Sequence, residues 1–270
     1  MTRPMIDPNR SIARFVAVGD SFPEGVGDDE PLCPNGVRGW ADRTAEVLAR
    51  RAAQRGDAPL RYANLAIRGK LLGPVVADQL DPALRMAPDL VAICAGVNDL
   101  LRPSVDIDDL MARYDSAIGA FVDTGALVFT FTAFDTAARP LFAALRGRFA
   151  IYNELLREIA DRRGVHLVDF WRMREFADRR MWEFDRMHLS PAGHHQMAIC
   201  VLESLGIAHD LVPVAFGPVE EISAGQRRKG NRQWAAQAAA PWIGRRLRGR
   251  SRGDGMSPKY PELTELAPTP

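Results

Sequence analysis

Five short apolar runs, separated by longer segments of helical spacing, constrain the fold more than any other feature of this sequence. The runs are rich in Val, Ile, Leu or Phe, are bounded by Gly, Pro, Asp or Asn, and lie at 14–18, 60–65, 90–94, 127–131 and 165–168. Each is typical of a buried strand. Helical spacing begins near Trp40 and recurs at 72–80, 106–122, 141–159 and 191–205. Strands that alternate with helices predict a parallel sheet with helices on both faces.

Polar residues follow several of these predicted strands at the same edge of the sheet. Ser21 comes just after the first strand, Gly69 a few residues after the second, and Asn98 just after the third. Asp185 and His188 follow the fifth strand, ahead of the last helix. Ligands of such sheets bind at the carboxyl ends of the strands. We therefore expect these five residues to meet at one site.

The stretch from Asp185 to Pro191 predicts a base that is held by a carboxylate. Asp185 stands three residues before His188 and could accept a hydrogen bond from one ring nitrogen, which leaves the other free to act as a base. Ser190 suits a helix N-cap and Pro191 the first helical position, so the loop should be a fixed bend. Such a base could take the proton of Ser21, the candidate nucleophile.

Attack by a serine on an ester carbonyl creates an oxyanion, which needs hydrogen-bond donors. The candidates are the backbone N–H groups of Ser21 and Gly69 and the side-chain amide of Asn98. Losing one such donor typically costs about 10²–10³ in rate. A glycine at position 69 would let the backbone approach the substrate closely. Each residue alone also fits a turn, a helix cap or a surface hydrogen bond, so the prediction depends on their conjunction.

Four blocks of this sequence resemble the sequence blocks of the SGNH, or GDSL-like, hydrolases. They are Gly19-Asp20-Ser21-Phe22, the stretch from Asn64 to Gly69, Gly96-Val97-Asn98-Asp99, and the Asp185/His188 pair. The resemblance covers residues 15–205, and the family's usual Leu after the serine is Phe22 here. It implies a flavodoxin-like three-layer α/β/α sandwich with a five-stranded parallel sheet.

The resemblance also implies a serine esterase or acylhydrolase, without metal or cofactor, that cleaves a small-molecule ester through an acyl-enzyme. Ser21 would be the nucleophile, His188 the base and Asp185 the group that orients it. The Ser21 amide, Gly69 and Asn98 would form the oxyanion hole. The family includes thioesterases and sugar deacetylases, so a carbohydrate O-deacetylase or a thioesterase on the same site is an alternative. A binding protein on an inactive hydrolase fold would lack one of these residues, and none is missing.

Other residues near this edge have two interpretations each. The acidic stretch from Glu24 to Glu30 could bind a cation, but a solvated loop is the favoured interpretation. His194 and His195 could supply a second base or a metal ligand, although helix capping or packing is favoured. Four aromatic residues could wall an acyl pocket or belong to the core: Phe131, Phe134, Trp171 and Trp182.

The composition changes after residue 212 and divides the chain into two predicted parts. Residues 1–212 would form the catalytic domain, and 213–270 a basic extension with ten Lys or Arg against five Asp or Glu. The extension could pack Trp234 and Trp242 onto the domain, or contact an anionic membrane surface. Nucleic acid is not expected as a partner, because no nucleic-acid motif is present. Residues 256–270 contain four prolines and should be extended.

The remaining features favour an ordinary cytoplasmic protein. The three cysteines are an odd number without a C-x-x-C pair, which predicts neither a disulfide framework nor a zinc site. The first ten residues lack the apolar core of a signal peptide, and no later run reaches about 18 apolar residues. The net charge of +1 indicates no polyanionic partner for the chain as a whole.

Overall fold

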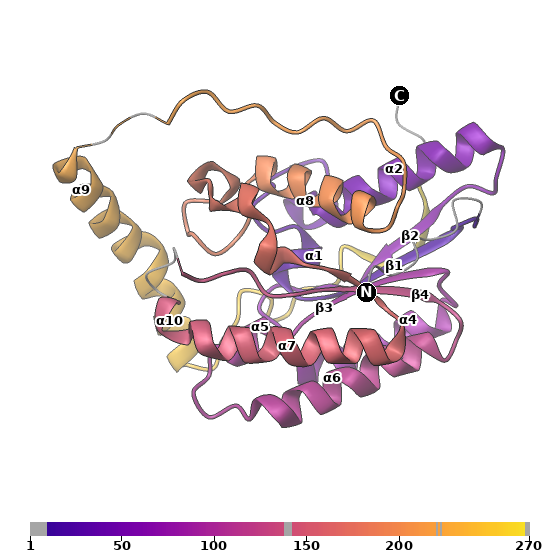
Figure 1. Ribbon diagram of the computed structural model, residues 1–270, viewed down its shortest axis with the longest axis horizontal. Coiled ribbons are helices and arrows are strands. Elements are labelled where there is room, and N and C mark those ends of the chain that lie inside the picture. The colour runs from indigo at the N-terminus through magenta and orange to yellow at the C-terminus, as the bar shows by residue number, and fades with distance from the viewer. Residues whose placement is uncertain (1–9, 138–141, 220, 222, 268–270) are drawn as a thin grey trace.

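A six-stranded sheet forms the centre of the computed structural model, which describes residues 10–137, 142–219, 221 and 223–267 (Figure 1). Five strands are parallel: Arg14–Gly19 (β1), Arg61–Asn64 (β2), Leu90–Cys94 (β3), Leu127–Phe131 (β4) and His166–Val168 (β5). The sixth strand, Tyr260–Glu265 (β6), pairs antiparallel with β2. The order across the sheet is β5-β4-β3-β1-β2-β6.

Helices cover both faces of this sheet. On one face lie Gly39–Arg55 (α2) and Pro191–Ser204 (α8), and on the other Ile107–Val122 (α6) and Arg146–Arg163 (α7) (Figure 1). The shorter helices are Ser21–Glu24 (α1), Leu72–Val75 (α3), Asp81–Arg85 (α4) and Val97–Leu100 (α5), and a π-helical turn, Val76–Leu80 (η2), joins α3 to α4. The 3₁₀ turns are Pro34–Gly36 (η1), Ala143–Leu145 (η3), Phe170–Arg172 (η4), Arg174–Ala177 (η5) and Arg179–Met181 (η6).

The predicted α/β fold is confirmed, and each of the five predicted strands is present. The predicted strand count is one short, because β6 comes from the C-terminal segment. Most of its residues are exposed, so no apolar run marks it in the sequence. The helix predicted from residue 141 begins at Arg146 as an α-helix, and residue 141 itself lies outside the described residues.

Strand β1 shows why the central strands are continuous apolar runs in the sequence. Phe15 and Ala17 join the core beneath α2 and α8, whereas Val16 and Val18 join the core beneath α6 and α7. All four are buried. Successive side chains of a strand point to opposite faces, so a strand covered on both faces needs apolar residues throughout.

Helix α6 shows how the sequence sets the helix boundaries. Asp106 is its N-cap, and its side chain accepts hydrogen bonds from the backbone N–H groups of residues 108 and 109. This cap satisfies donors that the first turn leaves without partners. The apolar stripe of this helix, which includes Tyr114, Ile118 and Phe121, is buried against the sheet.

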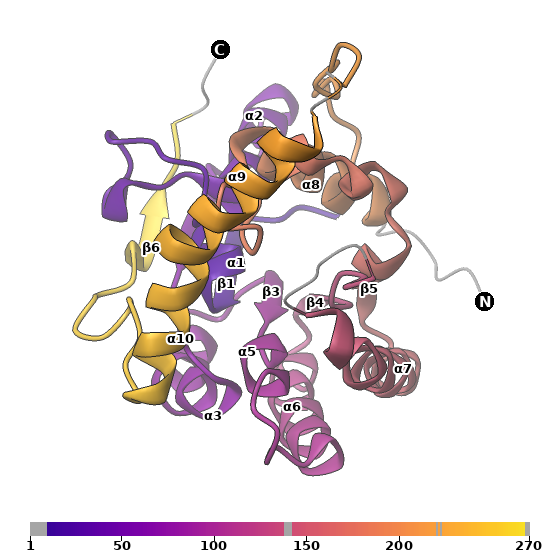
Figure 2. The same cartoon turned by 90° about the vertical axis from the view of Figure 1, so that its left-hand side faces the viewer.

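The C-terminal segment lies across the carboxyl end of the sheet. Ala224–Trp234 (α9), the π-helical turn Ala235–Ala239 (η7) and Ala240–Leu247 (α10) form one continuous helical run, which crosses in front of the strands in Figure 2. Trp234 Nε1 donates to the carbonyl oxygen of Asp185 at 3.0 Å. The Trp242 ring meets Phe142 edge-on, with 6.2 Å between the centroids. The chain then returns to add β6 beside β2.

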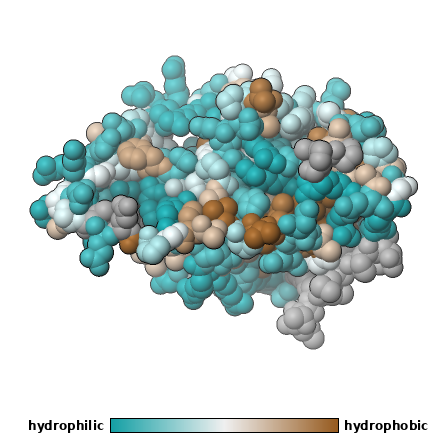
Figure 3. All heavy atoms as spheres, turned by 90° about the horizontal axis from the view of Figure 1, so that it is seen from above, coloured by the Kyte–Doolittle hydropathy of each residue, from teal (hydrophilic) through white to brown (hydrophobic). Residues whose placement is uncertain are grey.

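The surface on the side of α2 and α8 is mainly hydrophilic, and its apolar side chains are scattered in small groups (Figure 3). Val212, Val214 and Val219, in the segment between α8 and α9, are among the exposed large apolar residues. Scattered apolar residues of this kind are normal on a protein surface and do not indicate a partner.

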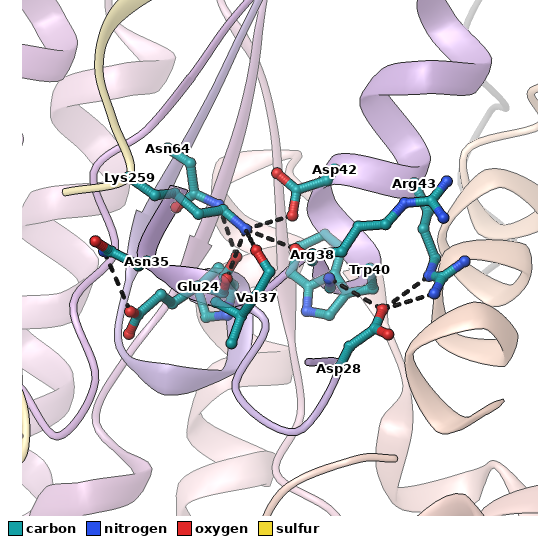
Figure 4. A network of polar contacts seen from close by, with 12 residues as sticks. Glu24, Asp28, Asn35, Val37, Arg38, Trp40, Asp42, Arg43, Asn64 and Lys259 are labelled. Carbon is teal, nitrogen blue, oxygen red and sulfur yellow. Dashed lines mark hydrogen bonds and ion pairs between the residues drawn. The ribbon is translucent and has the colours of Figure 1, made fainter. Parts of the chain in front are cut away.

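A buried lysine fixes the C-terminal segment to the first part of the chain (Figure 4). The Lys259 side chain is fully buried, and its ammonium donates to the Asp42 carboxylate and to the carbonyl oxygens of Glu24 (2.7 Å) and Arg38 (2.6 Å). Burial raises the pKa of Asp42 to about 7, and the Lys259 ammonium opposes that rise. A buried ammonium is tolerated only when it is paired and hydrogen-bonded in this way.

We predict that Lys259→Met lowers the free energy of unfolding by about 3–5 kcal/mol, because it leaves the buried Asp42 carboxyl without its partner. Urea unfolding followed by circular dichroism measures the change. Lys229→Met, on the exposed surface of α9, is the matched control and should change stability by less than about 0.5 kcal/mol. Equal stability of the two variants would contradict this role of Lys259.

Candidate active site

Ser21, His188 and Asp185 come together at the carboxyl end of the sheet. His188 Nε2 lies 3.0 Å from Ser21 Oγ, and His188 Nδ1 lies 2.6 Å from Asp185 Oδ2. Both distances are those of hydrogen bonds, so a carboxylate, an imidazole and a hydroxyl form one chain. An arrangement of this kind can remove the hydroxyl proton as the serine attacks a carbonyl.

A tight turn after β1 positions Ser21. Gly19 has φ +146°, and a Cβ there would lie 2.0 Å from the carbonyl oxygen of Cys94 in β3, so only glycine fits. Asp20 caps α1, because its Oδ1 accepts from the backbone N–H of Phe22 at 3.1 Å. Ser21 is therefore the first residue of a short helix that begins at the end of the strand.

The loop that carries Asp185 and His188 is a fixed bend, as predicted. Asp185 Oδ1 accepts from the backbone N–H groups of Met187 (2.9 Å) and His188 (3.0 Å). Ser190 caps α8 by accepting from the N–H of Gly193 at 3.2 Å. Burial raises the pKa of Asp185, but its hydrogen bonds to the side chain and N–H of His188 outweigh this and lower it to about 2. Asp185 is consequently an anion throughout the neutral range.

Asn98 reaches the same site, and its amide is already hydrogen-bonded. Asn98 Nδ2 donates to Asp20 Oδ2 at 3.0 Å and to the carbonyl oxygen of Lys70 at 3.1 Å. Burial raises the pKa of Asp20 to about 7. Asp20 was not among the predicted site residues, although it directly precedes Ser21. An oxyanion beside Ser21 would compete with these two acceptors for the Asn98 amide.

Gly69 lies at the rim of the site, against the C-terminal segment. Its φ is +78°, a left-handed conformation that favours glycine, and a Cβ there would lie 2.1 Å from Ser251 Oγ. Ser251 Oγ donates to the carbonyl oxygen of Arg68 at 3.0 Å, which holds the two segments together. Glycine at position 69 is therefore favoured by its packing against Ser251, in addition to the predicted close approach of the backbone to the substrate.

Two cavities meet at Ser21. One, the aromatic cavity of about 120 Å³, has mainly apolar walls that include Phe22, Phe131, Phe134, Phe142, Phe149, Phe170, Trp182 and Trp242. The other, of about 520 Å³, has mainly polar and charged walls. Residues that line both include Ser21, Asn98, His188 and Trp242. An ester with its carbonyl at Ser21 can thus place an apolar part in one cavity and a polar part in the other.

The aromatic residues considered from sequence divide into two groups. Phe131, Phe134 and Trp182 line the aromatic cavity. Trp171 does not, and the Arg146 guanidinium lies 5.5 Å from its ring centroid instead. Trp242 lines the same cavity from a helix far away in the sequence, and no local signal indicates that position.

The acidic stretch after Ser21 is only in part the solvated loop that was expected, because Asp29 is exposed whereas Glu24 and Asp28 are buried. Glu24 is fully buried and pairs with Arg68 at 2.7 Å. The buried Asp28 pairs with Arg43 at 2.7 Å (Figure 4). The expectation missed this because both arginines are distant in the sequence.

His194 is a packing residue, as favoured. It is buried, its Nδ1 accepts from the N–H of Trp40 at 3.2 Å, and its Nε2 donates to the carbonyl oxygen of Val26 at 3.1 Å. Burial lowers the pKa of His194 to about 4, so the ring is neutral.

All three cysteines are free. Among the described residues, no group of three or more His, Cys, Asp or Glu could hold a metal ion. No helix in the described ranges is long and apolar enough to cross a membrane.

The chain belongs to the GDSL-like lipase/acylhydrolase family, whose model matches residues 17–196. The matched range contains Ser21, Gly69, Asn98, Asp185 and His188. As a member of this family, the protein is a serine hydrolase that acts on ester bonds. No curated protein matches the chain.

Solved structures share the fold. LAE5, an α/β hydrolase enzyme from the metagenome of Lake Arreo in Spain, has a TM-score of 0.60 and 24% identity over 73% of this chain and 97% of its own. Axe2, an acetylxylan esterase from Geobacillus stearothermophilus, has a TM-score of 0.58 and 20% identity over 75% and 98%. TesA has a TM-score of 0.55 and 23% identity over 71% and 97%. Each alignment leaves about a quarter of this chain uncovered.

We predict that Gly69→Ala lowers the free energy of unfolding by more than Gly56→Ala does. Both glycines have a left-handed φ, +78° and +68°, so each alanine costs about 1–2 kcal/mol for its backbone conformation. Only the Cβ at position 69 meets another residue, Ser251, whereas position 56 is open. Chemical unfolding measures both. Because Ser251→Ala also removes the hydrogen bond to Arg68, the comparison is a double-mutant cycle: Gly69→Ala should cost less in the Ser251→Ala background than in the wild type. An equal cost in both backgrounds would refute the contact.

Proposed function

We propose that the protein is a metal-independent serine esterase that cleaves carboxylic esters through an acyl-enzyme. The observation that best supports this is the chain of contacts from Asp185 through His188 to Ser21, 2.6 Å and 3.0 Å long, at the junction of two cavities. Ser21 is the nucleophile and His188 the base. Asp185 orients the imidazole and stabilises the imidazolium that forms.

The reaction proceeds in two halves. Ser21 Oγ attacks the ester carbonyl carbon while His188 Nε2 takes its proton, and the carbonyl electron pair moves to the oxygen. His188 then gives the proton to the leaving alcohol as its bond to the carbonyl carbon breaks, which leaves the acyl group on Ser21. A water molecule then attacks this acyl-enzyme by the same steps, with His188 again as the base, and the carboxylic acid is released.

Three donors serve the oxyanion in this proposal: the N–H groups of Ser21 and Gly69 and the amide of Asn98. In the part of the chain that the structure describes, neither backbone N–H has a protein acceptor, which supports the assignment. The Asn98 amide must share its hydrogens between the oxyanion and its present acceptors, Asp20 and Lys70. Such donors stabilise the charge without having to reorganise during the reaction.

The aromatic cavity receives the acyl group in this proposal. Its aromatic side chains offer more apolar surface than an acetyl group can cover, which favours a longer acyl chain. The structural neighbour Axe2 is an acetylxylan esterase, so a carbohydrate O-deacetylase is the second candidate. A p-nitrophenyl ester series from acetate upward separates them, because a deacetylase would be fastest on acetate. Failure to cleave any member would refute the esterase proposal.

We predict that Ser21→Ala reduces kcat/KM on p-nitrophenyl butyrate by about 10⁴-fold or more, because the nucleophile is lost. The far-ultraviolet circular dichroism spectrum should not change. Ser116→Ala, at an exposed position of α6, is the control and should keep the wild-type rate. A fluorophosphonate should label the wild-type protein at Ser21. Activity in the Ser21→Ala variant, or labelling at another serine, would contradict the assignment.

We predict that Asn98→Ala lowers kcat by about 10²–10³ and raises KM much less, since the oxyanion develops only toward the transition state. Steady-state kinetics on the same ester gives both constants. Gln233→Ala removes an amide from the exposed surface of α9 and serves as the control. A rise in KM at unchanged kcat would instead assign Asn98 to ground-state binding.

A further inference from the structure

We propose that the larger cavity beside Ser21 binds a phosphate-bearing leaving group through arginines of the C-terminal segment. The inference rests on the esterase function proposed above and names its class of substrate. The substrate would be an ester or thioester with an apolar acyl group and a phosphorylated alcohol or thiol.

Cationic side chains from three separate segments line this cavity. Arg68 and Lys70 follow β2, and Arg102 follows α5. The other three lie in α10 and the loop after it: Arg245, Arg250 and Arg252. The acidic residues in its lining are Asp29, Glu183, Asp185 and Asp254. Half of the cationic residues therefore come from the C-terminal segment.

Some of the cationic side chains that line the larger cavity are already paired with a carboxylate, and others are not. Arg68 pairs with the buried Glu24, and Lys70 pairs with Asp78, each at 2.7 Å. In contrast, no carboxylate within the described ranges forms an ion pair with the other four, Arg102, Arg245, Arg250 and Arg252. These four guanidinium groups can bind an anion without giving up a partner.

Two of the acidic lining residues are already engaged. Asp185 holds His188 at 2.6 Å, and Asp254 accepts a hydrogen bond from the backbone N–H of Ser251 at 2.8 Å. Asp29 and Glu183 belong to other loops, before α2 and before His188. The lining holds six cationic and four acidic residues, and within the described residues none of these four acids forms an ion pair with the four arginines.

The pKa of Arg245 is lowered by burial and by the positive charges beside it. Arg245 is half-buried, and these charges are those of Arg252 and Arg248. Like charges that converge without a counter-charge destabilise the unliganded protein. A bound anion would remove this repulsion.

The shared wall between the cavities orients the substrate. Ser21, His188 and Trp242 line both, so the scissile carbonyl sits at the junction. With the acyl group among the aromatic residues, the leaving group must extend among the arginines. The concave position favours a small molecule over a flat membrane surface.

Phosphate fits this set of side chains better than a carboxylate does. A phosphate monoester carries about −1.5 to −2 charges near neutral pH and offers three acceptor oxygens. Guanidinium groups bind such oxygens in a bidentate manner. Four unpaired guanidinium groups exceed what one carboxylate can engage.

The first experiment compares esters with the same acyl group. The pairs are 1-butyrylglycerol with its 3-phosphate, and S-butyryl-3-mercaptopropanol with its phosphate, so the two arms separate an alcohol from a thiol leaving group. In at least one pair the phosphorylated member should have a kcat/KM about tenfold higher or more, and the preference should weaken as salt is added. Equal kcat/KM values within both pairs would overturn the proposal.

The second experiment assigns the preference to the C-terminal segment. Arg245→Gln and Arg252→Gln should each reduce the ratio of the two kcat/KM values by about tenfold, since each removes a charged hydrogen-bond donor. Arg232→Gln removes the same charge from α9 outside both cavities and should keep the wild-type ratio. An equal loss in all three variants would show that only the net charge matters, and would overturn the proposal.

Binding without turnover separates this proposal from the esterase function. The Ser21→Ala protein should bind glycerol 3-phosphate in calorimetry, and Arg245→Gln in that background should weaken the binding. Hydrolysis of neutral esters without any phosphate binding would refute the phosphate site alone. Phosphate binding without hydrolysis of any ester would support the site and refute the esterase.

Discussion

The ammonium of Lys259 makes the contact on which the shape of the candidate site depends. It is cut off from water, so it must be satisfied by the Asp42 carboxylate and by carbonyl oxygens that include that of Glu24, three residues after Ser21. Strand β6 begins at the next residue and extends the sheet beyond β2. The helices α9 and α10 are therefore held between this anchor and α8, which keeps Trp242 at the junction of the two cavities.

The sequence could predict the features that depend on local periodicity and on strand ends. The five parallel strands are continuous apolar runs, and Ser21, Asn98 and His188 each follow a strand, so their convergence follows from the fold class. Strand β6 could not be predicted in this way, because its residues are mostly exposed. The burial of Glu24 depends on Arg68, a contact between distant segments that no local pattern indicates.

The proposed division of the chain at residue 212 follows a change in composition, and the contacts cross it. Trp234 donates to the carbonyl oxygen of Asp185, and Ser251 lies against Gly69. Trp242 lines the aromatic cavity together with residues of the first part. Three of the ten Lys or Arg residues of the C-terminal segment line the larger cavity: Arg245, Arg250 and Arg252. The segment therefore completes the wall beside Ser21 and supplies part of its positive charge.

Strand β6 also affects how the molecules behave toward one another in concentrated solution. The outer edge of β2 would otherwise present unpaired N–H and C=O groups, which can template the addition of strands from other chains. Tyr260–Glu265 occupies that edge, and its exposed residues include Pro261 and the charged Glu262 and Glu265. Proline and charge at an edge discourage further pairing. The segment that completes the cavity wall therefore also protects the sheet against aggregation. A chain without this segment would expose an edge strand that can pair with strands of other chains.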